Sequence, residues 1–318
     1  MASVARLGQA AITARVPAKI NLQLAVGPAR ADGYHSLVTV FHAVSLFDEL
    51  TVLPAGETSL SVSGEDAAVV PADQSNLAWQ AAIALAKAAG LRDAAVEIRI
   101  RKRIPAAAGL AGGSADAAAA LVACNELWQT GLSSAELAEI GAGLGSDVPF
   151  SLMGGTAVGR GRGEQLTPAL AAGTYHWALA FGREGLPTPQ VYATCDRLRE
   201  ARAASENRPA PGEPKLSHPL MTALRSGDPA RVGPLLSNDL QPAALSLRPG
   251  LRRTLTAGRE NGAVGAIVSG SGPTCAFLAR SAAHAREIAV GLTGAGVCRA
   301  VARASGPVPG ASVVRDGT

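Results

Sequence analysis

The chain has 318 residues, of which 47% are hydrophobic, so it is long and apolar enough to bury the cores of about two domains. Its formal net charge is +4 and its basic residues are scattered, which argues against a nucleic-acid-binding surface and fits a small anionic substrate better. None of the four cysteines belongs to a CxxC pair, so we expect reduced thiols in a cytoplasmic protein rather than a disulfide framework or a zinc site. Glycine, serine and aspartate interrupt the apolar run at residues 106–124, so no membrane-spanning helix is expected.

The first hundred residues predict several strands and one helix. Alternating or continuous apolar patterns indicate strands at residues 11–26, 34–44 and 49–53. Asp32-Gly33 is a turn signal between the first two. Residues 76–89 have helical spacing and end at Gly90, which is a suitable C-cap. Residues 95–104, AVEIRIRKRI, alternate strictly and predict another strand.

A glycine-rich segment, PAAAGLAGGSADAA at residues 105–118, follows that strand and precedes an alanine-rich helical run to Trp128. Gly109, Gly112 and Gly113 let the backbone approach a ligand closely. A helix that begins directly behind such a loop offers unpaired N–H donors and a partial positive charge, so together they predict a phosphate cradle. A loop before an ordinary helix is the alternative.

The second half of the chain carries further predicted elements. Ser133 or Ser134 is expected to cap a helix that has Glu136 in its first turn. Residues 199–218 are polar and contain prolines, which predicts an exposed loop, and the Gly/Pro-rich tail from Ser305 onward is expected to be loosely held. Strands are predicted at residues 175–181, 263–268, 274–279 and 297–302, and a helix at residues 282–291.

Two polar residues, Lys19 and Asn21, lie inside the otherwise apolar strand VPAKINL. A buried lysine is unfavourable unless it is paired, so this pattern indicates a functional site with an acidic partner. The alternative is an edge strand with Lys19 in solvent, and from this segment alone that alternative is favoured.

A single aspartate, Asp147, lies between a glycine turn and an apolar segment in LGSDVPF, residues 144–150. One interpretation is a helix cap or an Asx turn. The other is a carboxylate held at a reactive site and charge-paired with Lys19.

The segment SGSGP at residues 269–273 separates two predicted strands. It could form a simple hairpin turn, but two residues suffice for that, so the longer loop is expected to supply a second backbone surface near an anion. The string GRGRG at residues 159–163 is interpreted as a hairpin turn, and no Walker A lysine follows the glycines of residues 109–113.

The segments PAKINL, PAAAGLAGGSADAA and GSGP, in that order, resemble the GHMP kinases. Within that superfamily, ADGYHSLVTVF (residues 31–41), LGSDVPF, PTPQVY (residues 187–192) and SNDL (residues 237–240) resemble the branch that phosphorylates 4-diphosphocytidyl-2-C-methyl-D-erythritol in the non-mevalonate isoprenoid pathway. The matching segments span residues 15 to about 280, which is nearly the whole chain.

The resemblance implies a two-domain α+β fold with the active site in the interdomain cleft. Residues 1–170 would form an N-terminal α+β nucleotide-binding domain, and residues 171–318 a C-terminal ferredoxin-like α+β domain. It implies ATP and Mg²⁺ as cofactors and transfer of the ATP γ-phosphoryl group to the substrate 2-hydroxyl. The partner would be this small molecule, with no nucleic acid and no membrane, and the protein a monomer or a homodimer.

The resemblance also implies roles for individual residues. Asp147 matches the catalytic base and Lys19 the catalytic lysine, while Asn21 matches a position near the acceptor hydroxyl. Ser114 is the candidate for the hydroxyl on the Mg²⁺ side. The positions that match the ATP site are the loop Pro105, Ala106, Ala107, Ala108, Gly109, Leu110, Ala111, Gly112, Gly113, Ser114 and Ala115, with Asn76 and Leu77 near the adenine and Lys102 at its edge.

On the substrate side, Tyr34 and His35 match the pair that recognises cytosine, since a ring can stack on the base while an imidazole reads its edge. Tyr192 matches a second aromatic that sandwiches the base, with Thr188 nearby. The residues expected from the Gly/Ser loop are Gly270, Ser271 and Gly272.

Two positions depart from the family pattern: Ala111 stands where glycine is usual, and Ala115 where serine is frequent. A methyl group at Ala111 is expected to require a negative φ there. Two alternatives remain open from the sequence. One is a GHMP kinase for another small alcohol (homoserine, a mevalonate-type acid or a sugar), and the other is a non-catalytic nucleotide-binding relative.

Overall fold

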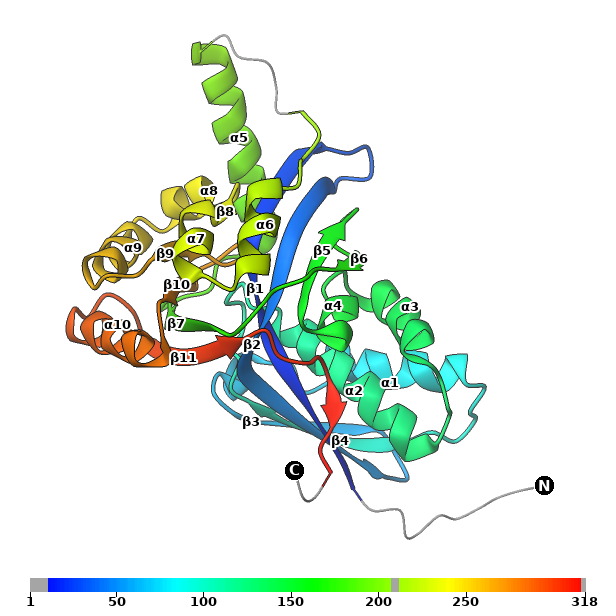
Figure 1. Ribbon diagram of the computed structural model, residues 1–318. Coiled ribbons are helices and arrows are strands. Elements are labelled where there is room, and N and C mark those ends of the chain that lie inside the picture. Colours follow the sequence, from blue (N-terminus) through cyan, green and yellow to red (C-terminus); the bar gives the residue numbers. More distant parts are fainter. Residues whose placement is uncertain (1–10, 207–211, 316–318) are drawn as a thin grey trace.

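The protein is described by a computed structural model that places residues 11–206 and 212–315. In this part of the chain two β-sheets form, with helices packed around them (Figure 1). The larger sheet has the strand order β12-β1-β2-β4-β3, and β5 pairs with β2, β6 with β5 and β8 with β1. Its strands are β1 (Ile12–Ala29), β2 (His35–Pro54), β3 (Ser59–Gly64), β4 (Val96–Lys102), β5 (Thr156–Arg160), β6 (Gln165–Pro168), β8 (Ser237–Asn238) and β12 (Ser312–Val313).

The smaller sheet is antiparallel, with the order β11-β7-β10-β9. Its strands are β7 (Tyr175–Phe181), β9 (Gly265–Val268), β10 (Cys275–Ala279) and β11 (Ala300–Gly306). The mixture of mainly antiparallel sheets and separate helices makes the fold α+β, as expected.

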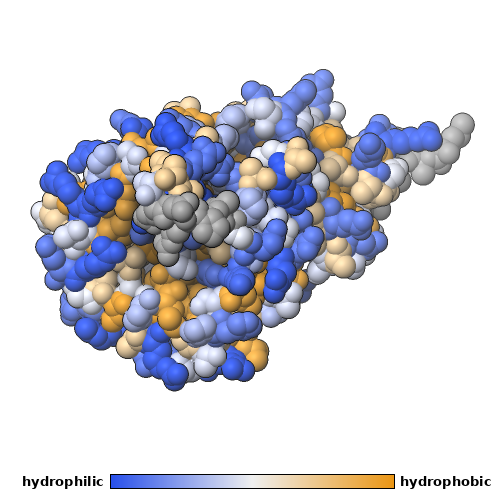
Figure 2. Space-filling model, turned by 90° about the horizontal axis from the view of Figure 1, so that it is seen from above, coloured by the Kyte–Doolittle hydropathy of each residue, from blue (hydrophilic) through white to orange (hydrophobic). Residues whose placement is uncertain are grey.

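The helices pack around the two sheets, and four of them gather beside the larger one. In Figure 1, α1 (Leu77–Ala88), α2 (Gly112–Trp128), α3 (Ser134–Leu144) and α4 (Val148–Met153) lie together beside the larger sheet. The others are α5 (Thr188–Glu206), α6 (His218–Ser226), α7 (Pro229–Val232), α8 (Gln241–Leu247), α9 (Gly250–Glu260) and α10 (Ala282–Gly294), with short 3₁₀ turns at Ala67–Val69 and Gly233–Leu235. On the face seen in Figure 2, hydrophilic and apolar residues are interspersed.

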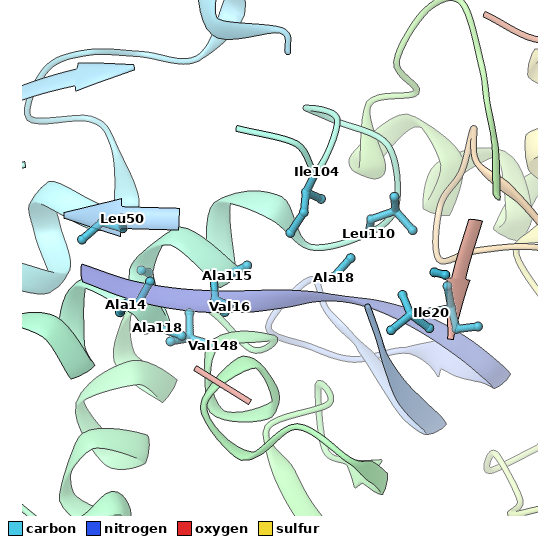
Figure 3. Packing of buried hydrophobic residues seen from close by; sticks show 14 of the residues in the cluster. Ala14, Val16, Ala18, Ile20, Leu50, Ile104, Leu110, Ala115, Ala118 and Val148 are labelled. Carbon is cyan, nitrogen blue, oxygen red and sulfur yellow. The ribbon is translucent and has the colours of Figure 1, made fainter. Parts of the chain in front are cut away.

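The core of the larger sheet explains why a helix as poor in large side chains as α2 is stable here. Alanines of α2, including Ala115 and Ala118, are fully buried and face β1, where Val16 and Ile20 are also fully buried (Figure 3). Small side chains let the helix axis approach the sheet closely, so tight packing replaces large apolar area.

Most of the predicted elements are confirmed. Asn76 caps α1, whose end at Gly90 has φ 67°, and Ser133 forms a capping box with Glu136 at α3. Strand β7 has the predicted bounds, residues 175–181. The two strands expected at residues 34–44 and 49–53 are one continuous strand, β2, because irregularities in its pairing with β1 let it continue.

The prediction of a loop at residues 199–218 is wrong for its first part, because helix α5 continues to Glu206. The next helix, α6, begins at His218. Residues 207–211 lie outside the described residues. This helix was hard to recognise because it is polar along much of its length, without a strong apolar stripe.

The prediction of a loosely held tail from Ser305 onward is also wrong in part. Strand β11 runs to Gly306, and β12 pairs antiparallel with β1 at Ala14 and Arg15. Backbone pairing needs no particular side chains, so a short Gly/Pro-rich segment can add to the edge of a sheet. Residues 316–318 lie outside the described residues.

The division at residue 170 stays a prediction. Two strands from beyond that position, β8 and β12, pair with β1 in the larger sheet. The second half of the chain therefore contributes directly to the sheet that holds Lys19.

Candidate active site

The glycine-rich segment lies between β4 and the N-terminus of α2, which begins at Gly112, as predicted. The expectation of a negative φ at Ala111 is wrong, because Ala111 has φ 60° and Ala107 has φ 49°. A left-handed conformation costs a non-glycine residue roughly 1–2 kcal/mol. Tertiary contacts hold it in place: Leu110 is fully buried, and its carbonyl accepts a hydrogen bond from Lys19 N at 3.2 Å.

The loop packs directly on the segment SGSGP. Ser269 Oγ donates to the carbonyl of Gly109 at 3.0 Å, and Thr274 N donates to Ala108 O at 3.3 Å. A β-carbon at Gly109 would collide with the carbonyl oxygen of Ser269, so only glycine fits there. The segment does connect the antiparallel strands β9 and β10, as a hairpin would, and it also forms one wall of the site.

Asn238, in the SNDL segment, holds this second loop in place. Its Nδ2 donates to the carbonyls of Val268 at 2.7 Å and of Gly270 at 2.8 Å. The residue is buried, so these bonds are shielded from water. The SNDL segment was noted from the sequence only for its resemblance, and this supporting role was not predicted.

Lys19 and Asp147 meet beside these two loops. Lys19 Nζ lies 3.7 Å from Asp147 Oδ2 and donates to Asn21 Oδ1 at 2.8 Å, and Asn21 Nδ2 donates to Thr39 Oγ1 at 2.8 Å. Lys19 and Asn21 are two positions apart in a regularly paired stretch of β1, so their side chains lie on the same face of the strand.

The structure contradicts the alternative interpretations of Lys19 as a solvated edge residue and of Asp147 as a helix cap. Lys19 is only 6% exposed and lies in a strand paired on both sides, so it is not a solvated edge lysine. Asp147 precedes α4, but its side chain makes no capping hydrogen bond there, and its carboxylate is 27% exposed. Asp147 is therefore oriented toward the cleft rather than toward the helix.

A cavity of about 420 Å³ joins these groups. Predicted site residues that line it are Lys19, Asn21, Leu77, Ala107, Ala108, Gly109, Ala111, Gly112, Gly113, Ser114, Asp147, Thr188, Tyr192, Gly270 and Ser271. Loops from both halves of the chain and the Lys19–Asp147 pair thus face one space.

A second cavity of about 660 Å³ adjoins the first and is lined by Tyr34, His35, Thr188 and Tyr192. The His35 ring lies 5.0 Å from that of Tyr192, and His35 Nε2 is 3.0 Å from Asp196 Oδ1. Tyr34 is 54% exposed, and the guanidinium carbon of Arg162 lies 4.9 Å from its ring centre, so the part of the ring that Arg162 does not cover is open to a ligand. Burial raises the pKa of Tyr192, which keeps this phenol neutral. The two cavities share the lining residues Leu37, Ser146, Arg162, Thr188 and Tyr192.

Several predicted residues do not face the cleft. Lys102 is the clearest correction: its ammonium is buried and bonded to Asp48 at 2.5 Å and Asp116 at 2.6 Å, so it cannot contact adenine in this conformation. Asn76 uses its side chain for Ala78 N and Pro71 O. The other predicted residues that line neither of the two cavities are Pro105, Ala106, Leu110, Ala115 and Gly272.

Sequence reasoning missed Arg162 and Asp196. Arg162 belongs to the string that was interpreted only as a hairpin turn, and it does lie between β5 and β6. Its glycine neighbours were the available signal. No local sequence signal pointed to Asp196, because its partner His35 is 161 positions away in sequence.

Comparisons with known proteins identify the family of the chain. The model of the GHMP kinases N terminal domain matches residues 76–155, and that of the GHMP kinases C terminal domain matches residues 220–297. The 4-diphosphocytidyl-2-C-methyl-D-erythritol kinase of Nocardia farcinica is 57% identical over 303 residues, covering 95% of this chain and 96% of that protein. The chain belongs to the 4-diphosphocytidyl-2-C-methyl-D-erythritol kinase family. It is an ATP-dependent small-molecule kinase of the GHMP superfamily.

Solved structures of a kinase of this family and of a homoserine kinase share the fold. A crystal structure of 4-(cytidine 5'-diphospho)-2C-methyl-D-erythritol kinase superposes with a TM-score of 0.73 at 34% identity, covering 92% of this chain and 98% of that one. Homoserine kinase from Cytophaga hutchinsonii superposes nearly as well, with a TM-score of 0.71 at 17% identity, covering 98% and 100%. Since a kinase for another acceptor has the same fold, the acceptor must be argued from the site.

No helix among residues 11–206 and 212–315 is long and apolar enough to cross a membrane.

Proposed function

We propose that this kinase transfers the γ-phosphoryl group of ATP to the 2-hydroxyl of 4-diphosphocytidyl-2-C-methyl-D-erythritol. The observation that carries the proposal is the continuity of the two cavities, one with the Lys19–Asp147 pair and the phosphate loop, the other with Tyr34, His35 and Tyr192. A long substrate with a base at one end and an alcohol at the other fits such a double site. A homoserine or mevalonate-type acceptor would leave the second cavity without a role.

In the proposed reaction, Asp147 accepts the proton of the acceptor hydroxyl as its oxygen bonds to the γ-phosphorus. The bond from the γ-phosphorus to the bridging oxygen breaks, and ADP leaves. Lys19 stabilises the negative charge on the transferring group, and its bond to Asn21 fixes the ammonium in the cleft. The backbone N–H groups at the start of α2 face the same cavity and are suited to the other phosphates of ATP.

Magnesium would add charge neutralisation at the phosphates. The residues present fit such an ion in a limited way: the Ser114 hydroxyl and the Asp147 carboxylate both face the cleft and are oxygen donors. No cluster of three or more His, Cys, Asp or Glu suited to a metal occurs among the described residues. We therefore propose that most Mg²⁺ ligands come from ATP and water, with Ser114 on the protein side.

The division into domains at residue 170, the cytoplasmic location and the monomeric or homodimeric state also remain our proposals. The four cysteines are free, as expected for reduced thiols. Light scattering on the purified protein would distinguish the two assembly states.

The function is tested by incubating the purified protein with ATP, Mg²⁺ and a panel of alcohols, followed by mass spectrometry of the products. We expect one phosphoryl group on the cytidyl substrate and none on homoserine, mevalonate or galactose. Preferred phosphorylation of an acceptor without cytosine would contradict the proposal. ATP binding without any phosphorylated product would favour a non-catalytic role.

A further inference from the structure

The hairpin between β5 and β6 carries an arginine at the junction of the two cavities. Arg162 lines both the cavity that holds Asp147 and the cavity that holds Tyr34. Its neighbour on the same hairpin, Arg160, is exposed and lines neither. The two arginines therefore differ in what they face, although they are only two positions apart.

The tip of this hairpin is held in place by its own hydrogen bonds. Leu37 N on β2 donates to Gly161 O at 2.8 Å, and Arg162 N donates to Glu164 Oε2 at 2.7 Å. A β-carbon built on Gly163 would lie 4.0 Å from Asp147 Oδ1, so the tip lies beside the candidate base. The position of Arg162 relative to the reacting groups is thus fixed by the fold.

The side chain of Arg162 points its charge toward the ligand space. Its guanidinium carbon lies 4.9 Å from the centre of the Tyr34 ring. It forms no ion pair with a carboxylate in residues 11–206 and 212–315. An arginine without an acidic partner, next to an open cavity, is a favourable site for an anion.

The proposed substrate supplies such an anion at this place. Its base belongs in the cavity of Tyr34, and its alcohol belongs beside Asp147. The diphosphate that joins them must pass the residues that line both cavities, namely Leu37, Ser146, Arg162, Thr188 and Tyr192. Arg162 alone among these five carries a positive charge.

We propose that Arg162 binds the diphosphate linker of the acceptor substrate and determines specificity for a nucleoside diphosphate over a monophosphate or a free nucleoside. A guanidinium can donate two parallel N–H bonds to phosphate oxygens, while its face stays on Tyr34. One residue would then couple recognition of the base to recognition of the linker. This inference rests on the proposed function, because it takes the linker from that substrate.

The test compares cytidine, CMP and CDP as inhibitors of the wild-type kinase and of Arg162→Ala, Arg162→Lys and Arg160→Ala. We expect Arg162→Ala to weaken CDP binding roughly 10- to 100-fold, as for loss of a charged hydrogen-bonded contact. Cytidine binding should change less than about threefold, within the range of a weak exposed cation–π contact. Arg162→Lys should be intermediate, and Arg160→Ala should match the wild type.

Two results would overturn the inference. One is equal weakening of cytidine and CDP, which would mean that Arg162 only supports the Tyr34 ring. The other is unchanged CDP binding in Arg162→Ala. Calorimetric titration of the same three ligands gives this comparison without turnover. If the protein fails to phosphorylate the cytidyl substrate, the proposed function fails, and the titrations still decide the role of Arg162.

Discussion

Lys19 Nζ and Asp147 Oδ2 lie 3.7 Å apart, at the meeting point of strand β1 and the start of helix α4. Neither residue can be understood alone. The lysine is buried in the larger sheet, and the carboxylate is left uncapped at the entrance of a short helix. Both residues line the cavity beside the glycine-rich loop, and we propose that they act there on a hydroxyl and a phosphoryl group.

Replacing Lys19 should affect the chemical step more than ATP binding. Lys19→Met keeps most of the side-chain volume and removes the charge that stabilises the transferring group. We expect kcat to fall by a factor on the order of 100 or more, as for loss of one electrostatic stabiliser. Stopped-time assays with both substrates saturating measure this. A variant with kcat within about twofold of the wild type would exclude an electrostatic role for Lys19.

Asn238 should be needed for a well-formed Gly/Ser loop. In Asn238→Ala, the carbonyls of Val268 and Gly270 each lose a buried hydrogen-bond donor. We expect the free energy of unfolding to fall by about 1–3 kcal/mol. Urea denaturation followed by circular dichroism measures this, with the exposed neighbour Ser237→Ala as the matched control. Equal stability of the two variants would contradict the supporting role.

Relaxing the left-handed conformation at Ala111 should stabilise the protein. Ala111→Gly removes the steric cost of φ 60°. We expect the free energy of unfolding to rise by up to about 1 kcal/mol, because the added freedom of glycine in the unfolded chain offsets part of the gain. Thermal unfolding of Ala111→Gly beside Ala106→Gly, which has no positive φ, checks this. A loss of stability at Ala111 as large as at Ala106 would contradict it.

The acidic pair around Lys102 should make stability depend on pH. Burial raises the pKa of Asp116 to about 8, with its Oδ1 unpartnered and Asp48 bonded to the same ammonium. The folded state then binds this proton more tightly than the unfolded state. The stabilisation is complete below the unfolded pKa of 3.8 and is lost as pH rises through about 8.

The destabilisation caused by Asp116→Asn should therefore shrink as pH rises from 5 to 9, since asparagine does not titrate. Urea denaturation of both proteins at pH 5, 7 and 9 measures it, with the exposed Asp93→Asn as a control for general charge effects. A destabilisation that stays constant from pH 5 to pH 9 would contradict this, because it would show that Asp116 is already ionised in the folded protein at pH 5.

The glycine-rich loop and its neighbouring strand and helix were predictable because their signals are local. Alternation over residues 95–104 and glycines followed by an alanine-rich run need no knowledge of the rest of the chain. Lys19 and Asp147 were nominated as partners by the cost of burying a charge and by resemblance. Their residue types indicated a pair, and only the fold shows that they meet.

What remained unpredictable depends on contacts between distant segments. Nothing near Lys102 in sequence shows that Asp48 and Asp116 surround its ammonium. Nothing local shows that Arg162 faces a cavity while Arg160 faces solvent. The positive φ of Ala111 is likewise imposed by the packing of Leu110 and by β1, which overrides the preference of alanine.

The most direct test of the catalytic pair is the turnover of Asp147→Asn with ATP and the cytidyl substrate, together with its affinity for ATP. Asparagine keeps the shape of the side chain and cannot accept the proton. We predict that kcat falls by a factor on the order of 100 to 10,000, the range of a general base, while the Kd for ATP stays within about threefold. An Asp147→Asn enzyme that kept most of its kcat would show that proton removal occurs elsewhere, and the assignment of this cleft as the catalytic centre would be wrong.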